Sequence, residues 1–172
     1  MADLADRLAR GERAAFAELY DACADRLHHW LSLHTGSRVD ADDVVQETFV
    51  RLARMRKKLS KVENLTAFVF TVARHEAARL QKQQATEARV LSAKPADEPE
   101  DTAAACEAVE LVTLALAKLP VEQREIVELK AYAGLTLREI AEVTALPAGT
   151  VATRYRAALA RLRVWLTREC HD

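Results

Sequence analysis

The feature that most constrains this chain is a short helical pattern, a tight break and a longer helical pattern within residues 119–166. Thr136 precedes an apolar-periodic run, and Glu139 follows three residues later. This spacing predicts a capping box, in which each side chain satisfies a free backbone N–H at a helix start. Pro147 ends the short helix, because proline disfavours helical backbone in the residue before it. This layout is typical of a helix-turn-helix, whose second helix can enter the DNA major groove.

The charges of the second helix agree with DNA contact. From Val143 to Arg168 the chain has no acidic residue, and its bases are Arg154, Arg156, Arg161, Arg163 and Arg168. The apolar residues of this helix recur at helical spacing and predict its buried stripe: Val151, Tyr155, Ala158, Leu162 and Trp165. Most of the arginines lie off that stripe, so they form a cationic face suited to phosphates and base edges. A merely solvated helix face is the alternative, and the turn chemistry favours DNA contact over it.

Composition favours helices for the rest of the chain. Half of the 172 residues are apolar, and glycine and proline number only four each. No segment alternates apolar and polar residues over a useful length, so we expect an all-α protein. The chain contains no apolar run long enough to span a bilayer, and its charged first residues lead us to expect no signal peptide. Its three cysteines are widely spaced without a CxxC pair, which fits reduced thiols in a cytoplasm.

The helical patterns fall into two groups separated by a change in composition. Ahead of the helix-turn-helix, helices are predicted at residues 3–34, 41–56, 65–84 and 102–119. Asp40 can cap the second of these helices. Residues 93–101 carry two prolines, many acids and no large apolar residue, which is typical of a flexible linker. We therefore expect two small helical domains, at residues 1–88 and 105–172, joined by an acidic linker at residues 89–104.

The net charge of −1 conceals a strong separation of charge along the chain. Residues 51–61 carry six bases and no acid, whereas residues 97–110 carry six acids and no base. A partner meets the field of a local patch rather than the net charge, so neutrality does not argue against nucleic-acid binding.

Catalytic signatures are missing from the sequence. It contains no Gly-rich phosphate loop, no nucleophile elbow and no pair of catalytic carboxylates, so we expect neither an enzyme nor a bound cofactor. Cys23, His28 and His34 do not share one helix face, so a metal site is not expected either.

Motifs in both halves resemble those of sigma factors of bacterial RNA polymerase, of the sigma-70 family and its extracytoplasmic-function type. Residues 40–49 (DADDVVQETF) resemble the helix that binds core polymerase, and residues 64–74 (NLTAFVFTVAR) resemble the helix that meets the promoter −10 element. In the C-terminal half the resemblance lies in Leu119-Pro120, Gln123-Arg124, Gly134-Leu135, Glu139-Ile140-Ala141 and residues 147–154. The resemblance implies a transcription initiation factor that binds the β′ and β subunits of RNA polymerase core and directs the enzyme to promoter DNA.

The resemblance also implies a set of contact residues. Asp43, Gln46 and Glu47 share one polar helix face, which in the family docks on a coiled coil of β′. Promoter melting needs stacking surfaces and a cationic path for the single strand. The expected contacts around the −10 element are Arg54, Lys57, Lys58, Lys61, Asn64, Arg74, His75 and Arg79. The expected contacts to the −35 element are Thr150, Thr153, Arg154, Arg156 and Arg161.

The chain departs from the family pattern in its recognition helix. Ala152 and Ala157 occupy positions that are often basic in the family, and Thr144-Ala145 replaces a common Leu-Gly at the turn. Two alternatives stay open: a helix-turn-helix regulator that never touches core polymerase, and a sigma-like interaction module that does not support initiation. An anti-sigma factor is a further partner that the family suggests, whereas membrane insertion is not expected.

Overall fold

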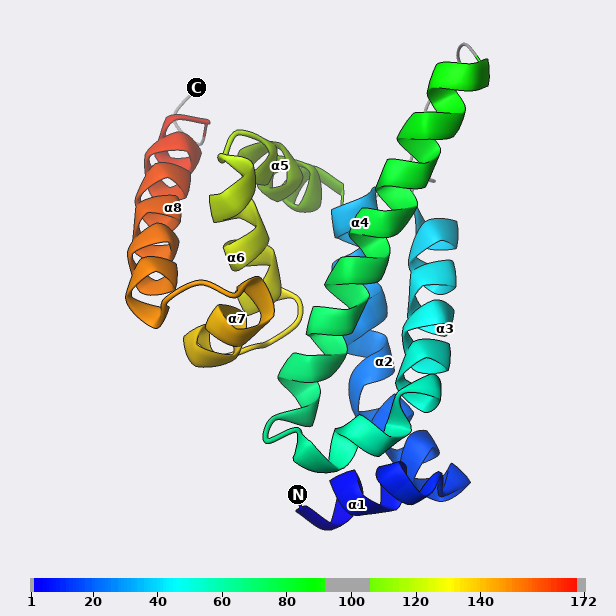
Figure 1. Cartoon of the computed structure of the whole chain (residues 1–172). Coiled ribbons are helices and arrows are strands. Elements are labelled where there is room, and N and C mark those ends of the chain that lie inside the picture. The colour runs from blue at the N-terminus through cyan, green and yellow to red at the C-terminus, as the bar shows by residue number, and fades with distance from the viewer. Residues whose placement is uncertain (1, 92–105, 170–172) are drawn as a thin grey trace.

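The computed structural model describes residues 2–91 and 106–169, and throughout these ranges the regular structure is helical (Figure 1). The elements, in order, are α1 (Ala2–Arg10), α2 (Arg13–Thr35), α3 (Arg38–Arg54), the 3-10 helix η1 (Arg56–Lys61), α4 (Leu65–Leu91), α5 (Cys106–Ala117), α6 (Val121–Ala131), α7 (Leu137–Thr144) and α8 (Ala148–Glu169). The predicted all-α fold class is confirmed. In the described ranges, no helix is both long and apolar enough to cross a lipid bilayer.

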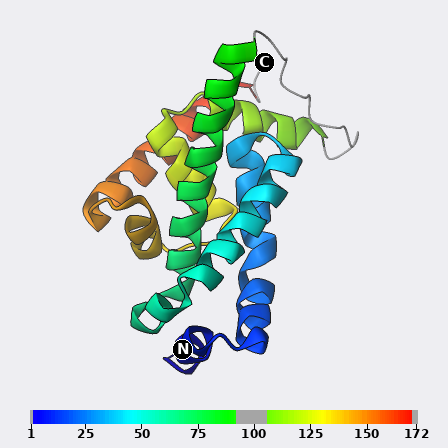
Figure 2. The same cartoon turned by 45° about the vertical axis from the view of Figure 1, so that its right-hand side comes forward.

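The N-terminal half is built on three upright helices, α2, α3 and α4, which pack against one another, with α1 and η1 at one end (Figures 1 and 2). Leu27, Trp30 and Leu31 of α2 and Phe70 of α4 are completely buried between the helices. Cys23 is also buried, and this burial raises the pKa of its thiol. The core therefore forms from apolar positions spaced three and four residues apart.

Two details of this half differ from the prediction. The single helix expected at residues 3–34 is broken at Gly11, which adopts a left-handed φ of 81° and lets α1 turn away from α2. The cap of α3 is Ser37, not Asp40, and the Ser37 hydroxyl accepts a hydrogen bond from the Asp40 backbone N–H at 3.2 Å. Asp40 instead lies in the first turn, where its carboxylate accepts a hydrogen bond from Gln84 at 3.0 Å.

The C-terminal half contains the predicted helix-turn-helix in α7 and α8. The capping box is confirmed, because Glu139 N–H donates to the Thr136 hydroxyl at 3.2 Å and Thr136 N–H donates to the Glu139 carboxylate at 2.8 Å. Val151 and Ala158 of α8 are buried, and Tyr155 is half-buried between the two apolar clusters of the fold. The predicted stripe therefore faces α5, α6 and α7.

The two halves share one hydrophobic core. Ile126, Leu135 and Ile140 of the C-terminal half lie in the same buried cluster as Leu27 and Phe70 of the N-terminal half. Helix α4 contacts α7, and α2 contacts α6. Of the predicted linker, residues 92–104 lie outside the described ranges, and residues 89–91 continue α4. The described parts of the two halves thus pack together as one body.

Replacing Ala145 with glycine should raise the free energy of unfolding by about 0.5–1 kcal/mol. Ala145 ends α7 with a left-handed φ of 55°, a conformation that costs a residue with a Cβ about 1–2 kcal/mol. Glycine removes this strain, and its greater freedom in the unfolded chain offsets part of the gain. Urea unfolding followed by circular dichroism measures the change. Ala160→Gly is the matched control, because the same substitution in the exposed middle of α8 should destabilise by about 1 kcal/mol.

Candidate nucleic-acid and partner interfaces

The predicted partner-binding face of α3 is exposed. Asp43 and Gln46 are exposed, whereas Glu47 is partly buried and lies 3.8 Å from Arg54. Two valines extend the same face, because Val39, Asp43, Gln46 and Val50 follow one another at helical spacing. Val39 is 71 % exposed and Val50 is 42 % exposed. The sequence prediction missed these valines, although their spacing from Asp43 and Gln46 could have identified them.

The basic segment at the end of α3 and in η1 presents its charges to solvent. Lys57, Lys58 and Lys61 are exposed and make no ion pair within the described part of the chain. Arg54 is exposed over three quarters of its side chain, and its contact to Glu47 is long. The hydrophobic core holds this segment in place, because Leu59 of η1 is completely buried. A rigid element therefore carries cations that can bind an anionic chain.

Two other residues predicted near the −10 element lie in the contact between the halves. The Arg74 guanidinium pairs in a bidentate manner with Glu125 of α6, with Nη2 3.2 Å from Oε2. This hydrogen-bonded partner raises the pKa of Arg74 above its already high ordinary value. The Asn64 amide donates to Glu139 of α7 at 3.1 Å, and its oxygen caps α4 at the Ala67 backbone N–H. The structure thus directs both side chains toward the C-terminal half.

Glu139 takes part both in the capping box of α7 and in the contact between the two halves. Its burial opposes ionisation, but hydrogen bonds from Thr136 and Asn64 outweigh that effect, so the pKa of Glu139 is lowered from its ordinary value of 4.5. One carboxylate therefore stabilises the start of α7 and also binds Asn64 across the interface.

A second group of contacts joins α2 to α6 and to the loop before α7. The Arg26 guanidinium donates to the Ala133 carbonyl oxygen, with Nε at 2.7 Å, and it lies over the Phe70 ring. His34 Nδ1 lies 3.6 Å from the Glu128 carboxylate, which is only 8 % exposed. The rings of His29 and Tyr132 are 5.1 Å apart. Both polar and aromatic contacts therefore accompany the shared hydrophobic core.

The remaining predicted −10 residues lie on the outer side of α4. His75 is exposed, and Arg79 is exposed but pairs with Glu76 at 2.8 Å. Glu76 is only 2 % exposed, and Arg51 of α3 pairs with it as well. Arg79 therefore has a structural partner as well as access to solvent.

The predicted −35 residues are divided between two sides of α8. Thr153, Arg156 and Arg161 are exposed, whereas Thr150 is partly buried near the start of the helix. Arg154 is directed toward α6, where its Nη2 lies 2.9 Å from the Glu122 carboxylate. The exposed side of α8 keeps a cationic character, and Arg154 would have to leave Glu122 to reach DNA.

Two protein-family profiles match this chain, one in each half. The family profile described as "Sigma-70 region 2" matches residues 19–86, and the profile described as "Sigma-70, region 4" matches residues 110–162. The first match contains the α3 face and the basic segment, and the second contains the helix-turn-helix.

Individual relatives agree with these matches. The ECF RNA polymerase sigma factor BldN of Streptomyces coelicolor is 30 % identical over 94 % of this chain, which spans 65 % of that protein. The ECF RNA polymerase sigma factor RpoE of Cereibacter sphaeroides is 30 % identical over 88 % of this chain and 86 % of its own length. The solved structure of CnrH in complex with the cytosolic domain of CnrY superposes with a TM-score of 0.73, at 25 % identity and 97 % coverage of each chain.

Proposed function

The chain belongs to the extracytoplasmic-function sigma factors of the sigma-70 family, which direct RNA polymerase to promoters, and we propose that its two halves divide that task. The N-terminal half binds core polymerase through α3 and holds the melted −10 strand along η1. The C-terminal half reads the −35 element with the exposed side of α8. As such a factor it is not an enzyme, and it acts in the cytoplasm, where its polymerase is found.

The observation that supports the polymerase contact best is the mixed face of α3. A docking surface combines apolar contact with polar groups that set the register, and two exposed valines beside an acid and an amide on one helix face fit that description. Val39 and Val50 would supply buried apolar area, and Asp43 and Gln46 would pair with basic groups of the partner.

The contacts of Asn64 and Arg74 suggest how the free chain is kept from DNA. Both side chains are candidates for the −10 strand, and both are engaged by α6 and α7. We propose that the halves separate on the polymerase, which releases these groups for the promoter. CnrH has a similar fold in its complex with the cytosolic domain of CnrY. A regulatory protein that binds both halves of this chain could therefore hold them together as well.

Replacing Asp43 with arginine should lower the affinity for core polymerase at least about tenfold, because charge reversal sets like charges against each other in the contact. The fold should be unaffected, since Asp43 is exposed and forms no ion pair within the described ranges. Co-elution with purified core and promoter-dependent transcription measure the effect. Asp25→Arg is the matched control, because it makes the same charge change at an exposed position of α2.

The same experiment separates the alternatives. Wild-type co-elution of the Asp43→Arg variant would show that the docking assignment is wrong. Duplex binding without any affinity for core would favour a helix-turn-helix regulator. Core binding without promoter-dependent transcripts would favour an interaction module.

A further inference from the structure

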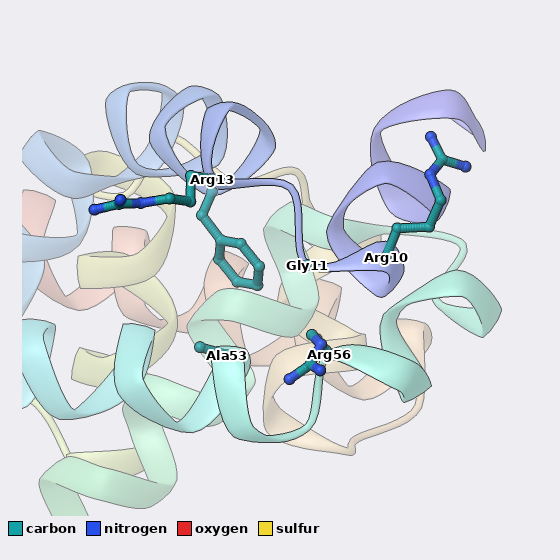
Figure 3. Close-up of a pocket in the computed structure, with 6 residues that line it drawn as sticks. Arg10, Gly11, Arg13, Ala53 and Arg56 are labelled. Atoms are coloured by element: carbon teal, nitrogen blue, oxygen red, sulfur yellow. The ribbon is translucent and has the colours of Figure 1, made fainter.

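A cationic hollow lies between the turn that joins α1 to α2 and the junction of α3 with η1 (Figure 3). Its volume is about 410 Å³, within the range of pockets that bind small molecules or parts of larger ones. The lining residues are Arg10, Gly11, Arg13, Phe16, Ala53 and Arg56. Three of these six residues are arginines, and Phe16 supplies a half-buried aromatic surface.

Two of the three arginine charges of this hollow are not neutralised by the described part of the protein. Within residues 2–91 and 106–169, Arg13 and Arg56 form no ion pair. Arg10 pairs with Glu12 at 2.8 Å, and Glu12 is shared with Arg7. Two exposed guanidinium groups therefore remain available beside one aromatic ring, which favours an anionic ligand.

The hollow is a built feature of the fold, since its two walls are fixed to each other. Leu8 of α1 and Leu59 of η1 are completely buried, and α1 packs along η1. Gly11 lets the turn approach so closely that a Cβ at this position would lie 3.0 Å from the Arg56 Nε. A Cβ there would crowd the flexible Arg56 side chain, and residues other than glycine rarely adopt the φ of 81°, so glycine suits this turn.

The directions of the arginines indicate an extended ligand. Figure 3 shows Arg10 and Arg13 extending away from each other on either side of Gly11, while Arg56 lies beneath the turn. A single small anion would require guanidinium groups that converge on one point. Arginines that diverge around an aromatic ring instead suit a chain of phosphates with flat groups between them, which is the chemistry of single-stranded nucleic acid.

The position of the hollow agrees with that ligand. Arg56 is the first residue of η1, whose Lys57, Lys58 and Lys61 are the expected contacts to the melted strand. We propose that the hollow binds single-stranded nucleic acid, with phosphates on Arg13 and Arg56 and a base against Phe16, and so extends the path along η1. This proposal rests on the proposed function for the role of η1. Arg10, Gly11, Arg13 and Phe16 precede residues 19–86, so the family match does not cover this part of the path.

The test measures binding of the full chain to a fluorescein-labelled fifteen-nucleotide oligothymidylate by fluorescence anisotropy at several salt concentrations. The Arg13→Ala/Arg56→Ala double variant should bind at least about fivefold more weakly at low salt. The plot of log binding constant against log salt concentration should become less steep by about 1.4, since each phosphate contact on a single strand contributes about 0.7. Arg38→Ala/Lys82→Ala is the charge-matched control, because both residues are exposed on other parts of the same half. This control should keep the wild-type slope.

Phe16→Leu separates base contact from charge. Leucine keeps an apolar side chain in the half-buried site but removes the stacking surface, so affinity should fall about fivefold or more while the salt slope stays unchanged. If Phe16 had only a structural role, its replacement would not lower the affinity while leaving the salt slope unchanged.

Wild-type oligonucleotide affinity and salt slope in the arginine double variant would overturn the proposal. If that variant instead loses affinity for core polymerase, the hollow binds an acidic protein surface. If Lys57→Ala/Lys58→Ala loses oligonucleotide affinity while the arginine variant does not, the role of η1 in the proposed function stays intact. If neither variant loses affinity, the single-strand role of η1 fails together with the hollow.

Discussion

Replacing Arg26 and Glu125 together with alanine is expected to raise the affinity of the free chain for single-stranded DNA about tenfold. Arg26 binds the Ala133 carbonyl and Glu125 holds Arg74, so the double variant removes two polar contacts between the halves. Neither residue belongs to the predicted DNA contacts, and Arg74 itself is retained. The net charge is also unchanged, because one base and one acid are lost. A gain in affinity would therefore come from release of the N-terminal half.

The size of the gain follows from the population of the open form. The apparent dissociation constant is the intrinsic constant divided by the fraction of molecules that can bind. If about nine molecules in ten are closed, only about one in ten can bind DNA, and the apparent affinity is about tenfold weaker. Anisotropy with a labelled single strand measures the affinity, and small-angle scattering measures the radius of gyration, which should increase. Arg7→Ala/Glu18→Ala is the control, because it removes an ion pair of 2.8 Å within the N-terminal half at the same net charge.

Unchanged affinity despite a larger radius of gyration would contradict the inhibitory role of the contact. Unchanged affinity at an unchanged radius would show that the shared apolar core alone keeps the halves together. In that case, Leu135 and Ile140 would be the positions to alter next, because both are completely buried in that core.

Local features of the fold could be predicted from the sequence because their causes lie within a few residues. Thr136 and Glu139 are three residues apart, and their capping box needs no other part of the chain. The buried positions of α8 follow from helical spacing in the same way, as Val151 and Ala158 show. Motif resemblance in both halves identified the family, because the order of two specific helical motifs is far more informative than either one alone.

Features set by tertiary contact could not be predicted. A single glycine inside a helical pattern is often tolerated, so Gly11 gave no clear sign that the chain turns there. The family resemblance predicts that Asn64 and Arg74 contact DNA, but a sequence does not show which side chains bind them within the folded chain. Their partners, Glu139 and Glu125, lie 75 and 51 residues away along the chain. Only the packing of α4 against α7 and of α2 against α6 brings them together.

The residue whose truncation should cost most stability is Trp30. It is completely buried where α2 meets α4, its ring lies 5.8 Å from that of Phe70, and it stacks on His34 at 5.1 Å. Trp30→Ala should lower the free energy of unfolding by about 3–5 kcal/mol, because a large cavity would remain in a core that cannot fully collapse. The loss should also weaken the contact between the halves, since His34 approaches Glu128 of α6.

Two further variants establish that this loss comes from packing. Among the residues that the structure describes, the buried Trp30 Nε1 has no hydrogen-bond partner, so Trp30→Phe removes an unfavourable buried N–H along with some volume and should cost only about 1–2 kcal/mol. Trp165→Ala applies the same truncation to a partly exposed side chain and should cost about 1 kcal/mol. Urea unfolding by circular dichroism gives the three values.

In Trp30→Ala, fluorescence of the remaining Trp165 reports on the C-terminal half alone. If the halves unfold as one cooperative unit, its midpoint should coincide with that of circular dichroism. Separate midpoints would mean that the shared core does not couple the halves, and a loss below about 1 kcal/mol would refute the central role of Trp30.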